Sequence, residues 1–205
     1  GTLLNDAAET KAIKVALDRD PSIKAVYATA SETSTGVKHN LEGIAQVIRG
    51  RDGVLLCVDA VTAIGAFDVP MDRWGLDVVC LGSQKALMLP PGLAMIAVSD
   101  KAWAANAKAD LPRFYLDLLR EKKSQERGEP AFTPAVSLIV GRRESLRTLR
   151  AAARAGVWAR HARLAKGPRR AAGAPGRHRR PPSPRPAAPA ASLPARPGGP
   201  PRRRP

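Results

Sequence analysis

The stretch from Asp77 to Leu93 reads D-V-V-C-L-G-S-Q-K-A-L-M-L-P-P-G-L. Its apolar run, Val78–Leu81, has the length and the β-branched character of a buried strand. Gly82 ends the run, and two prolines and a glycine keep the following segment from becoming a helix. The stretch therefore predicts a strand that leads directly into a constrained loop carrying Lys85. Taken alone, that lysine reads as an ordinary solvated loop residue.

A second apolar run lies upstream and ends in a carboxylate: Val54–Asp59 reads V-L-L-C-V-D. Its near-continuous hydrophobicity predicts a strand covered on both faces, as in a parallel α/β sheet. Ligands of such sheets bind at the carboxyl ends of the strands, where Asp59 and Lys85 are both expected. An isolated aspartate at this position is also typical of a helix cap or a turn. A carboxylate paired with a lysine is the arrangement by which enzymes hold pyridoxal phosphate: the lysine forms a Schiff base and the acidic group keeps the pyridine nitrogen protonated.

The rest of residues 1–159 alternates between strand-like and helix-like patterns. Residues 24–30 and 93–99 have strand character, and the second of these is expected to return through the core. Apolar spacing indicates helices within residues 1–20, over Leu41–Arg49 and from Ala135 to about Arg154. The alternation predicts an α/β fold with a mostly parallel sheet and flanking helices.

The cysteines and histidines give no sign of a metal site. Cys57 and Cys80 fall inside the two predicted strands, and we interpret them as small apolar core residues rather than as a disulfide. Their separation matches no zinc pattern, and the three histidines are scattered along the chain. We therefore expect no metal.

Three motifs, in this order, resemble the class V aminotransferases. They are E-T-S-T-G-V (Glu32–Val37), V-D-A-V-T-A-I-G (Val58–Gly65) and G-S-Q-K-A-L-M-L-P-P-G (Gly82–Gly92). The likeness extends over about residues 25–149 and is strongest to the branch of alanine–glyoxylate and serine–glyoxylate or serine–pyruvate aminotransferases. It implies the incomplete large domain of a fold-type I enzyme that uses pyridoxal 5'-phosphate and forms a homodimer.

The resemblance also implies roles for individual residues. Lys85 would bond the cofactor and transfer a proton, and Asp59 would keep the pyridine nitrogen protonated. Gln84 matches a donor on the phosphate side, and Thr33 matches a residue beside the ring. Thr133 matches a residue that reaches the phosphate of the neighbouring subunit's cofactor.

Two of these residues also have a purely structural interpretation. The hydroxyl group of Thr33 is of the kind that caps a turn after a strand. Thr133 precedes Pro134, and proline is favoured at the first position of a helix, so Thr133 is also a candidate cap.

The activity that the resemblance implies is transamination between a small amino acid, alanine or serine, and a 2-oxo acid such as glyoxylate or pyruvate. The alternative is a class V lyase of the cysteine desulfurase kind. That branch usually carries histidine immediately before the lysine, whereas this chain has Gln84 there. The transaminase is therefore the preferred prediction.

The net charge of +16 belongs mainly to one end of the chain. Residues 160–205 hold 13 Lys or Arg and no acidic residue, which leaves 34 − 13 = 21 basic and 18 acidic residues, a net of +3, in residues 1–159. We predict a partial cofactor-binding domain over 1–159 and a disordered tail rich in Arg, Pro, Ala and Gly over 160–205.

Two interpretations of this tail remain open. A basic tail can bind nucleic acid through counterion release. This one lacks stacking aromatic residues, so we do not expect nucleic acid as a partner. The other interpretation is a frameshift near Lys166, because Arg-Pro-Ala-Gly is what GC-rich DNA encodes in a wrong frame.

No apolar run reaches the roughly 18 to 20 residues of a membrane span, so no membrane association is expected. The two cysteines fit a reducing, cytoplasmic location. The chain does not begin with Met, and it lacks both the glycine-containing phosphate loop and the carboxylate-binding arginine that the family implies. We therefore expect a piece of a longer protein.

Overall fold

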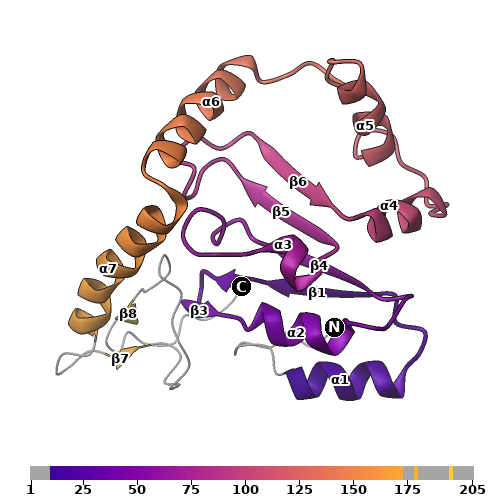
Figure 1. Ribbon diagram of the computed structural model, residues 1–205, viewed down its shortest axis with the longest axis horizontal. Coiled ribbons are helices and arrows are strands. Elements are labelled where there is room, and N and C mark those ends of the chain that lie inside the picture. Colours follow the sequence, from indigo (N-terminus) through magenta and orange to yellow (C-terminus); the bar gives the residue numbers. More distant parts are fainter. Residues whose placement is uncertain (1–9, 173–177, 180–193, 196–205) are drawn as a thin grey trace, which may run out of the picture.

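The computed structural model describes residues 10–172, 178–179 and 194–195. Figure 1 shows a central sheet with α1 and α2 on one side and with α6 and α7 following one another along an edge of the molecule. The sheet has the order β1-β4-β5-β6, in which β1, β4 and β5 are parallel and β6 is antiparallel. This confirms the predicted α/β fold with a mostly parallel sheet. The strands are β1 (Ala25–Thr29), β4 (Leu55–Asp59), β5 (Val78–Gly82) and β6 (Ala94–Val98), with two short pairs, β2 (Ser31–Glu32) with β3 (Val37–Lys38) and β7 (His178–Arg179) with β8 (Pro194–Ala195).

The helices are placed by short-range sequence signals. In α2 every buried residue is apolar and lies on one face, and Asn40 caps the helix by accepting a hydrogen bond from the N–H of Gly43 at 3.0 Å. The chain passes from α6 to α7 at Ala153, whose φ of 52° ends the helix that we predicted to run to about Arg154. The helices are α1 (Thr10–Arg19), α2 (Leu41–Ile48), α3 (Met71–Trp74), α4 (Asp100–Ala107), α5 (Leu118–Glu126), α6 (Val136–Ala151) and α7 (Arg154–Ala172).

The hydrophobic core lies between the sheet and α1 and α2. Leu56 and Val58 of β4 point into it with 0% and 2% exposure, and Ile44 of α2 is fully buried against them. Burial of this kind contributes roughly 1.5–3 kcal/mol for each large apolar side chain. One face of the sheet is therefore covered by the hydrophobic core.

The opposite face of the sheet is largely open in the part of the chain that the structure describes. Tyr27 is 81% exposed there, and Cys57 and Cys80 are half-buried free thiols. The prediction that β4 is covered on both faces is thus wrong for the described residues, and the two cysteines are not core residues. Strand β6 lies at the edge of the sheet with Ile96 46% exposed, so it does not pass through the core as predicted.

The C-terminal part of the chain is helical beyond the boundary that we expected. The predicted division between residues 159 and 160 falls inside α7. Most of the expected tail, residues 173–177, 180–193 and 196–205, lies outside the described residues. None of the helices in the described ranges has an apolar stretch long enough to cross a membrane.

Candidate functional site

Ser83 closes the loop that carries Lys85. The Oγ of this fully buried serine donates to the carbonyl of Pro90 at 2.7 Å and accepts from the N–H of Leu93 at 3.3 Å. Its N–H donates to the carbonyl of Leu93 at 3.0 Å, and its carbonyl accepts from the N–H of Leu89 at 3.1 Å. Both ends of the loop are joined at one serine, and Lys85 lies exposed between them.

The loop between β4 and α3 packs against the Lys85 loop at Gly65. This glycine has a φ of +89°, and a Cβ placed on it would lie 2.8 Å from the Cβ of Ala86. Such an approach requires a residue without a side chain. The glycine thus lets the segment that follows Asp59 lie directly against the residue next to Lys85.

Asp59 lies at the carboxyl end of β4, as predicted. In the parallel register it is opposite Cys80 of β5, and its side chain is exposed. Its Oδ1 accepts a hydrogen bond from the N–H of Val61 at 2.9 Å, which is the arrangement of an Asx turn. The turn role that the sequence left open is therefore observed, and the role toward a cofactor nitrogen stays a prediction.

Thr33 and Lys85 line one cavity of about 730 Å³. The turn that carries Thr33 is held by Glu32, whose carboxylate accepts from the N–H and the hydroxyl of Ser34 at 2.8 and 2.7 Å. The N–H and then the hydroxyl of Ser34 lower the pKa of Glu32 below its usual value. Thr62 also lines the cavity, and its hydroxyl donates to the carbonyl of Ser31 at 2.8 Å. The hydroxyl of Thr62 is thus already engaged, whereas Thr33 is exposed.

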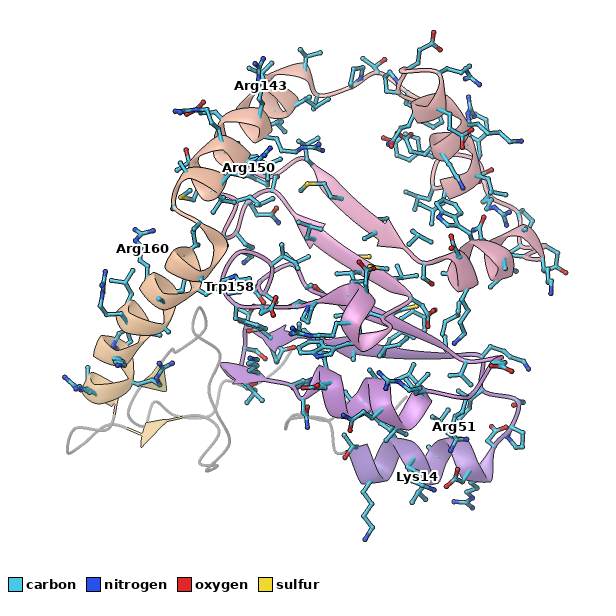
Figure 2. All side chains as sticks on the ribbon, in the orientation of Figure 1. Lys14, Arg51, Arg143, Arg150, Trp158 and Arg160 are labelled. Carbon is cyan, nitrogen blue, oxygen red and sulfur yellow. The ribbon has the colours of Figure 1, made fainter. Side chains whose placement is uncertain are left out.

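Helices α6 and α7 form the other wall of this cavity. Figure 2 shows Arg143 and Arg150 on α6 and Arg160 on α7, distributed along the two helices. His161 is half-buried, and its burial, together with the neighbouring Arg160, lowers its pKa. Sequence reasoning nominated none of the α7 residues, although their spacing of three to four places them on one face. The helix residues that line the cavity are Thr148, Leu149, Ala152, Gly156, Val157, Arg160, His161 and Arg163.

Gln84 and Thr133 are not among the residues that line the cavity. Gln84 is exposed and folds back over the end of β5, because a Cβ on Gly82 would lie 2.7 Å from its Oε1. Thr133 is exposed in the segment before α6. The N-cap of α6 is Ala135, without a side-chain hydrogen bond, so the interpretation of Thr133 as the cap of this helix is wrong. Asp59 does not line the cavity either, and the cofactor-binding roles of these three residues stay predictions.

The donor set of the cavity fits a small anion that an amine can hold. Ligand pockets in proteins measure roughly 300–1,000 Å³, and this cavity lies within that range. Its lining carries basic side chains from both walls and, among the described residues, no carboxylate. A phosphate-bearing aldehyde meets both requirements, because its phosphate is an anion for the basic side chains and its aldehyde can bond to the amine of Lys85.

Comparison with known proteins relates the chain to aminotransferases. The chain is 46% identical over 160 residues to a protein of Synechococcus sp. named as the small subunit of a soluble hydrogenase, covering 77% of this chain and 42% of that protein. It is 40% identical over 155 residues to the L-aspartate–glyoxylate aminotransferase of Paracoccus denitrificans, covering 75% of this chain and 39% of that enzyme. The chain thus spans about two fifths of the length of these relatives.

A solved structure and a family model extend this relation. The pyridoxamine–pyruvate aminotransferase of Mesorhizobium loti has a TM-score of 0.83 with 31% identity, over 90% of this chain and 48% of that one. The family model described as aminotransferase class-V matches residues 5–170, which include Lys85, Asp59 and all but the last two residues of α7. The chain therefore belongs to the class-V aminotransferase family.

Proposed function

We propose that the protein of which this chain forms a part is a pyridoxal-phosphate-dependent aminotransferase and that Lys85 is its catalytic residue. The observation that carries the proposal is the placement of Lys85. It lies on a loop closed at Ser83, directly beyond a strand of a mostly parallel sheet, and it lines a cavity without carboxylates in the described residues. An amine held in this way is suited to bond an aldehyde and then to act as a base.

Pyridoxal phosphate, when bound, supplies an aldehyde for amines and a ring that takes up electron density. Lys85 would anchor it through Nζ. Once a substrate amine has taken that place, the released amine of Lys85 would take the proton from the substrate Cα and deliver it to the carbon that was the cofactor's aldehyde, as transfer of the amino group requires. The chain thus contributes both the anchor and the base through one side chain.

Other residues of the chain would hold and orient the cofactor. Asp59 would maintain a proton on the ring nitrogen through a charge-assisted hydrogen bond. Thr33 would donate its hydroxyl beside the ring, and Gln84 would donate to the phosphate. Thr133 would reach the phosphate held by a second subunit, so the proposal includes a homodimer.

For the substrates, we propose a small amino acid and a 2-oxo acid, with alanine or serine as donor and glyoxylate or pyruvate as acceptor. The Paracoccus relative is named for aspartate and glyoxylate, and the Mesorhizobium structure is named for pyridoxamine and pyruvate. These names support a 2-oxo acid as acceptor and leave several donors to be compared. We place the reaction in the cytoplasm.

The cofactor assignment is tested by loading the chain with pyridoxal phosphate and reducing it with borohydride. We expect visible absorbance of the bound cofactor before reduction and, after digestion, a label on Lys85. Lys85→Ala should lose both signals, whereas Lys108→Ala, at an exposed lysine that does not line the cavity, should retain both. A label on another lysine, or an unchanged spectrum in Lys85→Ala, would contradict the proposal.

The reaction is tested by turnover in the longest polypeptide that the gene encodes around this chain. We expect alanine, serine or aspartate to transfer an amino group to glyoxylate or pyruvate. Release of sulfide from cysteine without amino transfer would instead identify the lyase alternative.

A further inference from the structure

Ser145 of α6 binds the backbone of the Lys85 loop. Its Oγ donates to the carbonyl oxygen of Leu87 at 2.5 Å. Ser145 is 8% exposed and Leu87 is 4% exposed, so this hydrogen bond is shielded from water. It joins residues 58 positions apart in the chain. Helix α6 is thereby attached to the loop two residues beyond Lys85.

The middle of this loop contains a strained backbone conformation at Met88. The N–H of Met88 donates to the carbonyl of Lys85 at 2.9 Å and closes a tight turn. Met88 has a φ of 59°, a left-handed conformation that residues with a Cβ disfavour. Such conformations persist where the surrounding structure over-determines them. The hydrogen bonds of Ser83 fix the ends of the loop, and Ser145 supports its middle from outside.

The same face of α6 packs against the loop at two further positions. A Cβ on Gly141 would lie 2.9 Å from Cδ2 of Leu89, and a Cβ on Gly92 would lie 2.7 Å from Cδ1 of Leu138. Positions 138, 141 and 145 recur at the three- to four-residue spacing of one helix face. The close approach of α6 brings the hydroxyl of Ser145 within reach of Leu87.

We propose that Ser145 is a positioning residue for Lys85: its hydroxyl holds the turn Lys85–Met88 against α6 and so aims the lysine into the cavity. The inference rests on the proposed function of Lys85. It assigns to α6 a task beyond packing, because the polar contact acts on the loop backbone rather than on the core.

The first test is amide hydrogen exchange in the 205-residue chain without cofactor. In Ser145→Ala we expect the amide of Met88 to exchange about tenfold faster, the effect of one lost hydrogen bond, while β4 and β5 stay protected. Ser145→Thr keeps the hydroxyl and should remain near the wild type. Ser137→Ala, at an exposed serine of the same helix, is the matched control and should change nothing in the loop.

The second test is the rate at which pyridoxal phosphate becomes bonded to Lys85, followed by absorbance. We expect about a tenfold lower rate in Ser145→Ala, because the amine is no longer oriented, and recovery in Ser145→Thr. If Ser145→Ala does not fold, Ser145→Cys takes its place. Cysteine is close to serine in size and keeps a weak hydrogen-bond donor, so we expect a rate of cofactor bonding between those of the wild type and Ser145→Ala.

The inference would be overturned if a folded Ser145→Ala or Ser145→Cys variant showed the same amide exchange in the loop, and the same rate of cofactor bonding to Lys85, as the wild type. A wild-type chain whose Lys85 never bonds the cofactor would overturn the proposed function instead. In that case the exchange measurement, made without cofactor, still decides whether Ser145 holds the loop.

Discussion

Asp59 of β4 lies directly opposite Cys80 of β5 in the parallel register, and the chain reaches Lys85 five residues after Cys80. Because parallel strands end at the same edge of a sheet, this register brings the carboxylate and the amine to one side of the domain. The N–H of Ala60 donates to the carbonyl of Cys80 at 2.8 Å, so the pairing of the two strands continues to the residue after the end of β4. The relationship between the two residues is thus set by backbone pairing.

Asp59 is expected to act through its charge. Asp59→Asn retains an oxygen that can accept from the N–H of Val61 and so preserves the turn, but it cannot hold a proton on a ring nitrogen. We expect kcat to fall on the order of 100-fold in both Asp59→Asn and Asp59→Ala. Asp52→Ala, at an exposed aspartate before β4, should leave kcat unchanged. Full activity in Asp59→Asn would show that only the turn matters.

Gly65→Ala should destabilise the protein through both backbone strain and crowding. A left-handed φ costs about 1–2 kcal/mol for alanine, and the contact with Ala86 adds about 1–3 kcal/mol. Urea denaturation should therefore show a loss of about 2–5 kcal/mol in the free energy of unfolding.

Two matched glycines separate the effect of backbone strain from the effect of crowding. Gly50 has a φ of +82° and nothing within 4 Å, so Gly50→Ala should show the strain alone, and Gly53→Ala should show neither effect. Equal losses in Gly50→Ala and Gly65→Ala would rule out the crowding.

Asp77 joins three strands at the end of the sheet opposite the site. Its buried carboxylate accepts from the N–H of Leu56 at 2.8 Å and from the hydroxyl of Ser99 at 2.9 Å, and it lies 3.6 Å from Nζ of Lys101. Asp77→Ala leaves two donors without a partner, so we expect a loss of about 2–4 kcal/mol in the free energy of unfolding. The measurement is urea denaturation, with exposed Asp72 mutated to alanine as the control. If Asp77→Ala loses no more free energy of unfolding than Asp72→Ala, the prediction is wrong and water replaces the carboxylate.

Glu32 should make the stability of the protein depend on pH in the acidic range. Its pKa is lowered in the folded state by the N–H and the hydroxyl of Ser34. The folded state therefore favours the ionised form, and this contribution is complete above the ordinary glutamate pKa of about 4.3. It is lost as the pH falls through the lower, folded-state pKa. We expect the difference in Tm between the wild type and Glu32→Gln to be positive near neutral pH and to vanish on acidification. A difference that does not change with pH would contradict this account.

Some elements of the fold could be read from the chain, whereas others, such as helix α5, could not. The strands β4 and β5 follow from short β-branched runs, and the Lys85 loop follows from its glycines and prolines, because these signals are local. Helix α5 is polar on nearly all sides and lacks an apolar period, so no spacing of apolar residues predicts it. What begins the helix is Asp117, whose side chain accepts from the N–H groups of Leu119 and Arg120.

By itself, the sequence determined which side chains stand at the strand ends and which family they resemble, since a carboxylate after one buried run and a lysine after the next are local features. Only the tertiary structure decided which of them meet. Thr33 and Lys85 line the same cavity, whereas Asp59 lies at the same sheet edge without lining it. It also decided that α7 forms the opposite wall and that Ser145 binds the loop at Leu87. The reason is physical: the direction of a side chain depends on contacts between elements far apart in the sequence, and no local pattern records them.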